Sequence, residues 1–147
     1  MEYTDFKNRF YKKYPHYKDY PIDAFMFGDD ANLLLKLVIE GKKQGTSSLH
    51  TLYEKENLEL PRVNTLSIVT NANDEPKAVI MIEKVECIPF NKITPAHAER
   101  EGEGDLSLEF WKKVHKKFFE MELSEHEETF NENMLVVYET FKCIYYE

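Results

Sequence analysis

The sequence predicts a single α+β domain in which helices flank a small sheet or barrel. Two observations favour this class. The length of 147 residues is that of one domain, and 42% of the residues are hydrophobic. Helical and strand-like patterns also alternate along the chain without an internal repeat or a Pro/Gly-rich linker. A chain of this size buries roughly 70% of its unfolded surface, which is enough for a core without disulfides or metals.

Two helices are predicted in the first third of the chain. Residues 4–14 place aromatic side chains at helical spacing, and two prolines follow within the next seven residues and end the helix. A second helix begins after Asp29 or Asp30, either of which can cap it. It ends at Gly41, where a left-handed residue suits the end of a helix.

Two more helices are predicted in the second half. Thr94 and Pro95 form a strong helix start, because threonine can cap free amide groups and proline suits the first helical position. This helix ends before Gly102, and a longer one spans Ser107–Leu123. His115 lies on the apolar face of the longer helix, so we predict a core histidine with a hydrogen-bond partner.

The predicted strands are Ser47–Tyr53, Leu66–Thr70, Lys77–Cys87 and a long central strand, Met134–Tyr146. Turn-forming residues occupy positions 71–76. One face of the third strand is predicted to carry Val79, Met81, Val85 and Cys87.

Charge and cysteine content exclude several classes of protein. The net charge of −8 argues against a protein that coats nucleic acid non-specifically. Basic clusters in residues 7–18 and 112–117 are interpreted as solvated helix faces. Cys87 and Cys143 lie in apolar alternating runs and are predicted to be buried, reduced thiols. No apolar run reaches the roughly 20 residues of a membrane helix, and no signal peptide is visible, so we expect a cytoplasmic location.

The first candidate site is the turn Gly41-Lys42-Lys43-Gln44-Gly45-Thr46 and the serines that follow it. Glycines allow a ligand to approach the backbone, lysines supply positive charge, and hydroxyl groups can donate a hydrogen bond or act as nucleophiles. The order of a P-loop is absent. The alternative is a glycine-stopped helix followed by an exposed turn. The ligand-binding candidates of this segment are Gly41, Lys42, Gln44, Ser47 and Ser48.

The second candidate site is the acidic loop Glu101–Asp105, which we expect to face the lysine turn. Glu101, Glu103 and Asp105 are candidates for ligand contacts, for a divalent cation or for acid–base chemistry, although the spacing is not that of an EF-hand. A solvated loop between helices is the alternative. His97 lies four residues before Glu101 on the same helix face, so we predict that it orients this glutamate.

Taken together, these elements resemble the ASCH domain, a family with a PUA-like β-barrel. The resemblance rests on the helix ending in Leu34–Gly41, the pattern Gly41-x-Lys43-x-x-Thr46, the segment Ile93–Gly102, and Glu101–Phe119, which is similar to the longer bacterial members. It spans about residues 25–145. It implies an ASCH-like domain over residues 23–147, with residues 1–22 as a helical extension packed on it.

The resemblance implies a cleft fitted to RNA or a modified nucleobase. We expect no cofactor, no metal, no membrane and no protein partner. We therefore expect RNA or modified-nucleoside binding. The alternative is an amidohydrolase that acts on acylated cytidine, with Lys43 as base, Thr46 as nucleophile and Glu101 as proton shuttle; a metal-dependent ribonuclease is a weaker option. Gln44 and Gly45 depart from the family pattern, and Gly45 predicts a looser turn before Thr46.

Overall fold

The computed structural model describes residues 2–28 and 30–147. The strands are β1 (Ile22–Met26), β2 (Gly45–Leu49), β3 (Leu66–Thr70), β4 (Pro76–Pro89) and β5 (Leu135–Tyr146). The helices are α1 (Glu2–Lys13), α2 (Ala31–Ile39), α3 (His50–Lys55), α4 (Pro95–Glu101) and α5 (Leu108–Ser124), with short 3₁₀ turns at Pro15–Tyr17 and Phe90–Lys92. Within the described residues, no helix has the length and apolar character needed to cross a membrane.

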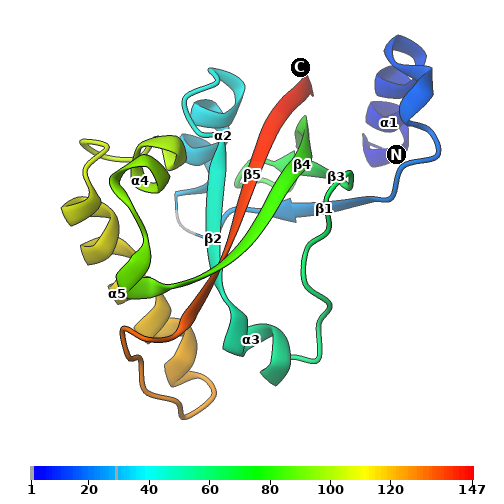
Figure 1. Cartoon of the computed structure of the whole chain (residues 1–147). Helices are drawn as coiled ribbons and strands as arrows, with labels where there is room; N and C mark the ends of the chain where they lie inside the picture. The colour runs from blue at the N-terminus through cyan, green and yellow to red at the C-terminus, as the bar shows by residue number, and fades with distance from the viewer. Residues whose placement is uncertain (1, 29) are drawn as a thin grey trace.

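The five strands form one sheet in the order β1-β3-β4-β5-β2. β1 and β3 are parallel, and the other neighbours are antiparallel. The long strands β4 and β5 cross the molecule and the sheet curls into half a barrel, with α4 and α5 together on one side and α1 near the far end of β3 and β4 (Figure 1). This arrangement confirms the predicted α+β class, although β4 rather than β5 is the middle strand.

Helix α1 packs on the outer face of the sheet. Phe6 and Phe10 are fully buried there against a cluster that includes Val79. The guanidinium of Arg9 forms two hydrogen bonds with the carboxylate of Glu147, at 2.7 and 2.8 Å. The first helix is therefore held by apolar contacts along one face and by an ion pair to the end of the chain.

The predicted capping residues start α2 and α4, and Ser107 starts α5 in the same way. Asp30 accepts a hydrogen bond from the amide of Leu33 at the start of α2, and Gly41 has the predicted left-handed conformation after its end (φ +77°). Thr94 and His97 cap α4 reciprocally. Ser107 caps α5 by accepting from the amide of the third helical residue. Asp29, the alternative cap of α2, lies outside the described residues.

The prediction of a strand over Ser47–Tyr53 is wrong in its second half. β2 begins at Gly45 and ends at Leu49, and α3 follows at once. A helical turn places Leu52 in the same core cluster as Leu49. Helical spacing also brings His50 Nδ1 within 2.9 Å of Glu54 Oε1.

The predicted face of β4 is also wrong, because a bulge interrupts the pairing of β4 with β5 between Ile82 and Lys84. Glu83 is the extra residue, so the side-chain alternation is inverted beyond it. Val79 packs beneath α1, whereas Cys87 lies on the opposite face. Both cysteines are free, as predicted, but Cys87 is exposed and Cys143 is only half-buried.

Gly45 does not loosen the turn. It is buried in β2, and a β-carbon at this position would lie 2.4 Å from the hydroxyl oxygen of Tyr138. That hydroxyl donates a hydrogen bond to the backbone carbonyl of His97 in α4. Because residue 45 has no side chain, the Tyr138 hydroxyl of β5 can reach the backbone of α4.

Candidate functional site

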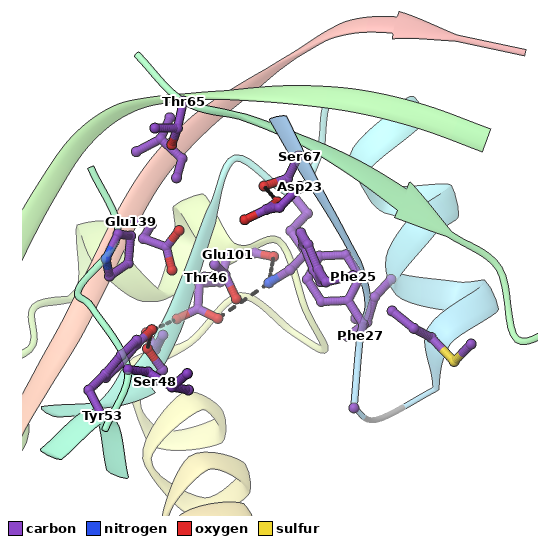
Figure 2. Close-up of a pocket in the computed structure, with 18 of the residues that line it drawn as sticks. Asp23, Phe25, Phe27, Thr46, Ser48, Tyr53, Thr65, Ser67, Glu101 and Glu139 are labelled. Carbon is purple, nitrogen blue, oxygen red and sulfur yellow. Dashed lines mark hydrogen bonds and ion pairs between the residues drawn. The ribbon is translucent and has the colours of Figure 1, made fainter. Parts of the chain in front are cut away.

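A cleft of about 810 Å³ opens between the curled sheet, the loop after α3 and the first half of α5 (Figure 2). Its size lies within the range of roughly 300–1,000 Å³ found for small-molecule sites. Strands β1, β2, β3 and β5 each contribute side chains to it. The cleft is therefore built from segments that are far apart in the sequence.

One side of the cleft is aromatic. Phe25 and Phe27 from β1 and the residue after it meet edge to face, with ring centroids 5.0 Å apart. Phe118 from α5 and Tyr53 from α3 also line the cleft, and the Tyr53 hydroxyl lies 2.8 Å from Ser48 Oγ. Such rings offer flat apolar surfaces that suit a planar ligand.

The polar part of the cleft contains a buried ion pair. Lys43 Nζ lies 3.3 Å from Glu101 Oε1 and 2.7 Å from Glu103 Oε2. Lys43 and Glu101 have only 2% and 1% of their surface exposed. The prediction that the lysine turn faces the acidic loop is therefore confirmed.

Glu101 is the centre of this polar network. Ser47 Oγ donates to Glu101 Oε2 at 2.5 Å, and the indole of Trp111 donates to the same oxygen at 2.6 Å. His115 Nε2 lies 3.2 Å from Oε1. Burial raises the pKa of Glu101, but the His115 hydrogen bond, the charges of Lys43 and His115 and the Ser47 hydrogen bond together lower it to about 2. Glu101 is thus a carboxylate that many donors stabilise.

Backbone contacts hold the lysine turn against the end of α4. The amide of Gln44 donates to the carbonyl of Arg100 at 2.7 Å. Gly102 adopts a left-handed conformation (φ +73°), and a β-carbon there would lie 2.1 Å from the carbonyl oxygen of Lys42. The two segments can approach this closely because residue 102 has no side chain.

Six of the predicted site residues line the cleft and five do not. The six are Lys43, Thr46, Ser47, Ser48, Glu101 and Glu103. The five outside the cleft lining are Gly41, Lys42, Gln44, His97 and Asp105.

The residues outside the cleft have other partners. The Gln44 side chain donates to the carbonyl of Gly41, and Asp105 accepts from the amide and hydroxyl of Ser107 before α5. The predicted pairing of His97 with Glu101 is wrong, because the His97 ring caps its own helix. His115 takes this place. It is the predicted largely buried histidine, and its Nδ1 also bonds the Trp111 carbonyl at 2.9 Å.

The alternation of β2 separates its hydroxyl groups. Ser47 reaches Glu101, whereas Thr46 pairs across the sheet with Glu139 of β5. Within residues 2–28 and 30–147, the hydrogen-bond partners of Lys43 Nζ are Glu101 and Glu103, and Thr46 is not among them.

Sequence reasoning missed the contributions of β1 and β5 to the cleft. Asp23 accepts a hydrogen bond from Ser67 Oγ at 2.6 Å, and Glu139 extends from the long strand into the cleft. β1 is short and follows Pro21, so it has little local signal. Glu139 had one available signal, since it is the acidic residue within the otherwise apolar and hydroxyl-bearing run 134–141.

Within the described part of the chain, no group of three or more His, Cys, Asp or Glu side chains is arranged to hold a metal ion. In the acidic loop, Glu101 and Glu103 both bond Lys43, whereas Asp105 bonds Ser107.

The comparisons with known proteins agree with this architecture. A family model described as the ASCH domain matches residues 23–145. The structure is similar to the ASCH domain from Lactobacillus crispatus JV V101, with 34% identity, a TM-score of 0.84, and coverage of 88% of this chain and 84% of that one.

Protein EF3133 from Enterococcus faecalis V583 is also similar, at 30% identity and a TM-score of 0.83, with 96% of this chain and 86% of that chain covered. The hypothetical protein PH0355 shares the fold alone, at 16% identity, a TM-score of 0.52 and coverage of 84% and 99%. No curated protein matches the sequence. The family match, together with the curled sheet and flanking helices shared with these structures, shows that this chain belongs to the ASCH domain family and has its PUA-like fold.

Proposed function

We propose that the cleft binds a nucleobase, either within a modified nucleoside or presented by RNA. The observation that supports this best is the combination of aromatic rings with a buried hydrogen-bonding network in one cleft of suitable size. Bases that are unstacked from RNA are commonly held by aromatic stacking and by hydrogen bonds to their edges.

The charge of the cleft favours the base rather than the phosphate. Five acidic side chains line it, against the two cations Lys43 and Arg62 and the imidazole of His115. Lys43 is paired with two of these carboxylates. The acidic side chains are Asp23, Glu59, Glu101, Glu103 and Glu139. A phosphate inside the cleft would meet uncompensated negative charge, so an uncharged nucleoside should bind more tightly than its 5′-monophosphate.

Trp111 gives a direct test of this proposal. It is the single tryptophan of the chain, and its indole bonds Glu101 in the cleft. Titration with nucleosides, their monophosphates and tRNA at low salt should change its fluorescence saturably. Phe25→Leu should weaken binding roughly tenfold or more, because base stacking contributes about 1–3 kcal/mol.

Tyr11→Leu is the matched control, since Tyr11 belongs to α1, packs against the Phe6–Phe10 cluster and does not line the cleft. The proposal fails if neither nucleosides nor tRNA bind saturably, as measured by fluorescence and by calorimetry. Equal losses of affinity in the two variants would also contradict it.

Hydrolysis of an acylated base is the second candidate, with Lys43, Thr46 and Glu101 as the catalytic set. The Thr46 hydroxyl favours it, because this hydroxyl lines the cleft and, within the described residues, has no hydrogen-bond partner. The geometry of Lys43 disfavours it, since its Nζ donates to the carboxylates of Glu101 and Glu103 and, within the described residues, forms no hydrogen bond with Thr46.

Thr46→Ala separates the two candidates. If Thr46 is a nucleophile, this change abolishes release of acetate from N4-acetylcytidine and leaves nucleoside binding nearly unchanged. Ser48→Ala removes a neighbouring hydroxyl on the same face of β2 and should keep turnover. Turnover that persists in Thr46→Ala would contradict the hydrolytic mechanism with Thr46 as nucleophile.

A further inference from the structure

Glu139 is a carboxyl group that the family motif does not include. It lies opposite Thr46 on β2 and opposite Val85 on β4, so β5 directs it to the side of the sheet that forms the cleft. Figure 2 shows its carboxyl group pointing toward the interior, near Thr46. Within residues 2–28 and 30–147 it has no hydrogen-bond or ion-pair partner. A partly buried carboxyl without a partner in a ligand-sized cleft is available to a ligand.

Asp23 acts on Glu139 across the cleft. Asp23 lies on the edge strand β1, and the hydrogen bond from buried Ser67 fixes its position. Burial, and then the negative charge of Asp23, raise the pKa of Glu139 to about 7. Glu139 is therefore neutral in a large fraction of molecules near neutral pH.

The other charged groups around the cleft are engaged elsewhere. Lys43 pairs with Glu101 and Glu103, and His115 lies against Glu101. Arg62 lies 3.6 Å from Glu59. Tyr53, from α3, is an uncharged neighbour whose own pKa is raised by burial and by the charge of Glu139, among other groups.

We propose that Glu139 is the specificity-determining residue of the cleft, and that its neutral carboxyl group forms hydrogen bonds with the edge of the bound base. It donates to an unprotonated ring nitrogen and accepts from the amino group beside it. This inference rests on the proposed function, because it requires that a base enters the cleft.

The chemistry of a neutral carboxyl distinguishes adenine and cytosine from the two-donor edge of guanine. It carries one O–H donor and one carbonyl acceptor side by side, whereas a carboxylate only accepts. Adenine and cytosine present an amino group beside a ring nitrogen that accepts, which matches the neutral form. Guanine presents two donors and matches the carboxylate. A site of this kind should bind adenosine or cytidine more tightly as the pH falls, and guanosine less tightly.

The test compares the wild type with Glu139→Gln, Glu139→Ala and Asp23→Asn. Binding of adenosine, cytidine, guanosine and uridine is measured by calorimetry between about pH 5.5 and pH 8.5, a range that brackets the titration of Glu139. Thermal unfolding of each variant at both ends of this range separates loss of fold from loss of binding.

In the wild type, the affinity for adenosine or cytidine should fall up to about tenfold for each pH unit above the Glu139 pKa, because binding takes up one proton. Glu139→Gln keeps a donor and an acceptor and should bind with little dependence on pH. Glu139→Ala should lose roughly tenfold or more at low pH, the equivalent of one hydrogen-bonded polar group. Asp23→Asn removes the neighbouring charge, so the fall should begin at a lower pH.

Two outcomes overturn the inference while the proposed function stands. One is wild-type affinity of Glu139→Ala for adenosine and cytidine at low pH. The other is an unchanged pH dependence in Glu139→Gln, which would show that a group other than Glu139 controls the pH dependence of binding. If no nucleoside or RNA binds to the wild type at any pH, the proposed function fails, and this inference fails with it.

Discussion

Replacement of Glu101 by alanine is expected to destabilise the fold by about 3 kcal/mol or more. The change removes one of the two carboxylate partners of buried Lys43 and leaves the donors of Ser47 and Trp111 without their Glu101 acceptor. Leaving a buried charged or polar group unpaired lowers the free energy of unfolding by more than the complete pair raises it. Urea denaturation followed by Trp111 fluorescence measures the loss.

The matched control is the double variant Lys43→Met/Glu101→Leu. It removes both charges and replaces them with apolar side chains of similar size, so it should recover the part of the stability that Glu101→Ala loses through the charge of Lys43, while the Ser47 and Trp111 donors stay without their acceptor. A double variant that is less stable than Glu101→Ala would contradict this account of the pair.

The same carboxylate should dominate the acid limb of the stability profile. Its pKa in the folded protein is about 2, below its ordinary value of 4.5. The stabilisation that Glu101 contributes is therefore present above about pH 4.5 and is lost as the pH falls toward 2. In Glu101→Gln, unfolding free energy should change less over this interval. An acid limb identical to that of the wild type would show that other carboxylates control acid unfolding.

Gly102→Ala is expected to have the second large effect, on the order of 3 kcal/mol. A positive φ costs about 1 kcal/mol for a residue with a β-carbon. The new β-carbon would in addition lie 2.1 Å from the backbone oxygen of Lys42, which has no side-chain freedom to move away. The lysine turn and the end of α4 must then separate, and the contacts of Lys43 with Glu101 are lost with them.

Gly41→Ala is a close control for this prediction. Gly41 has nearly the same φ (+77°), but a β-carbon there would have no atom within 4 Å. It should cost about 1 kcal/mol from backbone strain alone. Similar losses in the two variants, measured by urea denaturation, would mean that the close approach of the two segments contributes little. Nucleoside binding should fall in Gly102→Ala and remain near wild type in Gly41→Ala.

Local signals predicted much of the framework. The caps at Asp30 and Thr94 are short-range hydrogen bonds between residues three positions apart, so the residue types alone indicate them. The long apolar runs likewise predicted β4 and β5. The pairing of Lys43 with Glu101 was implied by the resemblance to the ASCH domain, whose pattern combines a lysine with a glutamate that closes the short helix.

Spacing along the chain failed where tertiary contacts compete with it. His97 is one helical turn from Glu101, but its ring instead caps the start of its own helix. His115, fourteen positions beyond Glu101, reaches the carboxylate because α5 packs against the end of α4. His115 therefore contacts Glu101, although it is farther from Glu101 along the sequence than His97 is.

The sequence by itself determined the α+β class, the boundaries of α1, α2, α4 and α5 to within a few residues, and the charged turn and loop that meet at Lys43 and Glu101. Tertiary structure alone decided the rest of the cleft. β1 joins the sheet through parallel pairing with β3, a strand about forty residues away, and strand register places Glu139 opposite Thr46. Such pairings depend on backbone hydrogen bonds that any residue can make, so side-chain types along the chain do not reveal them.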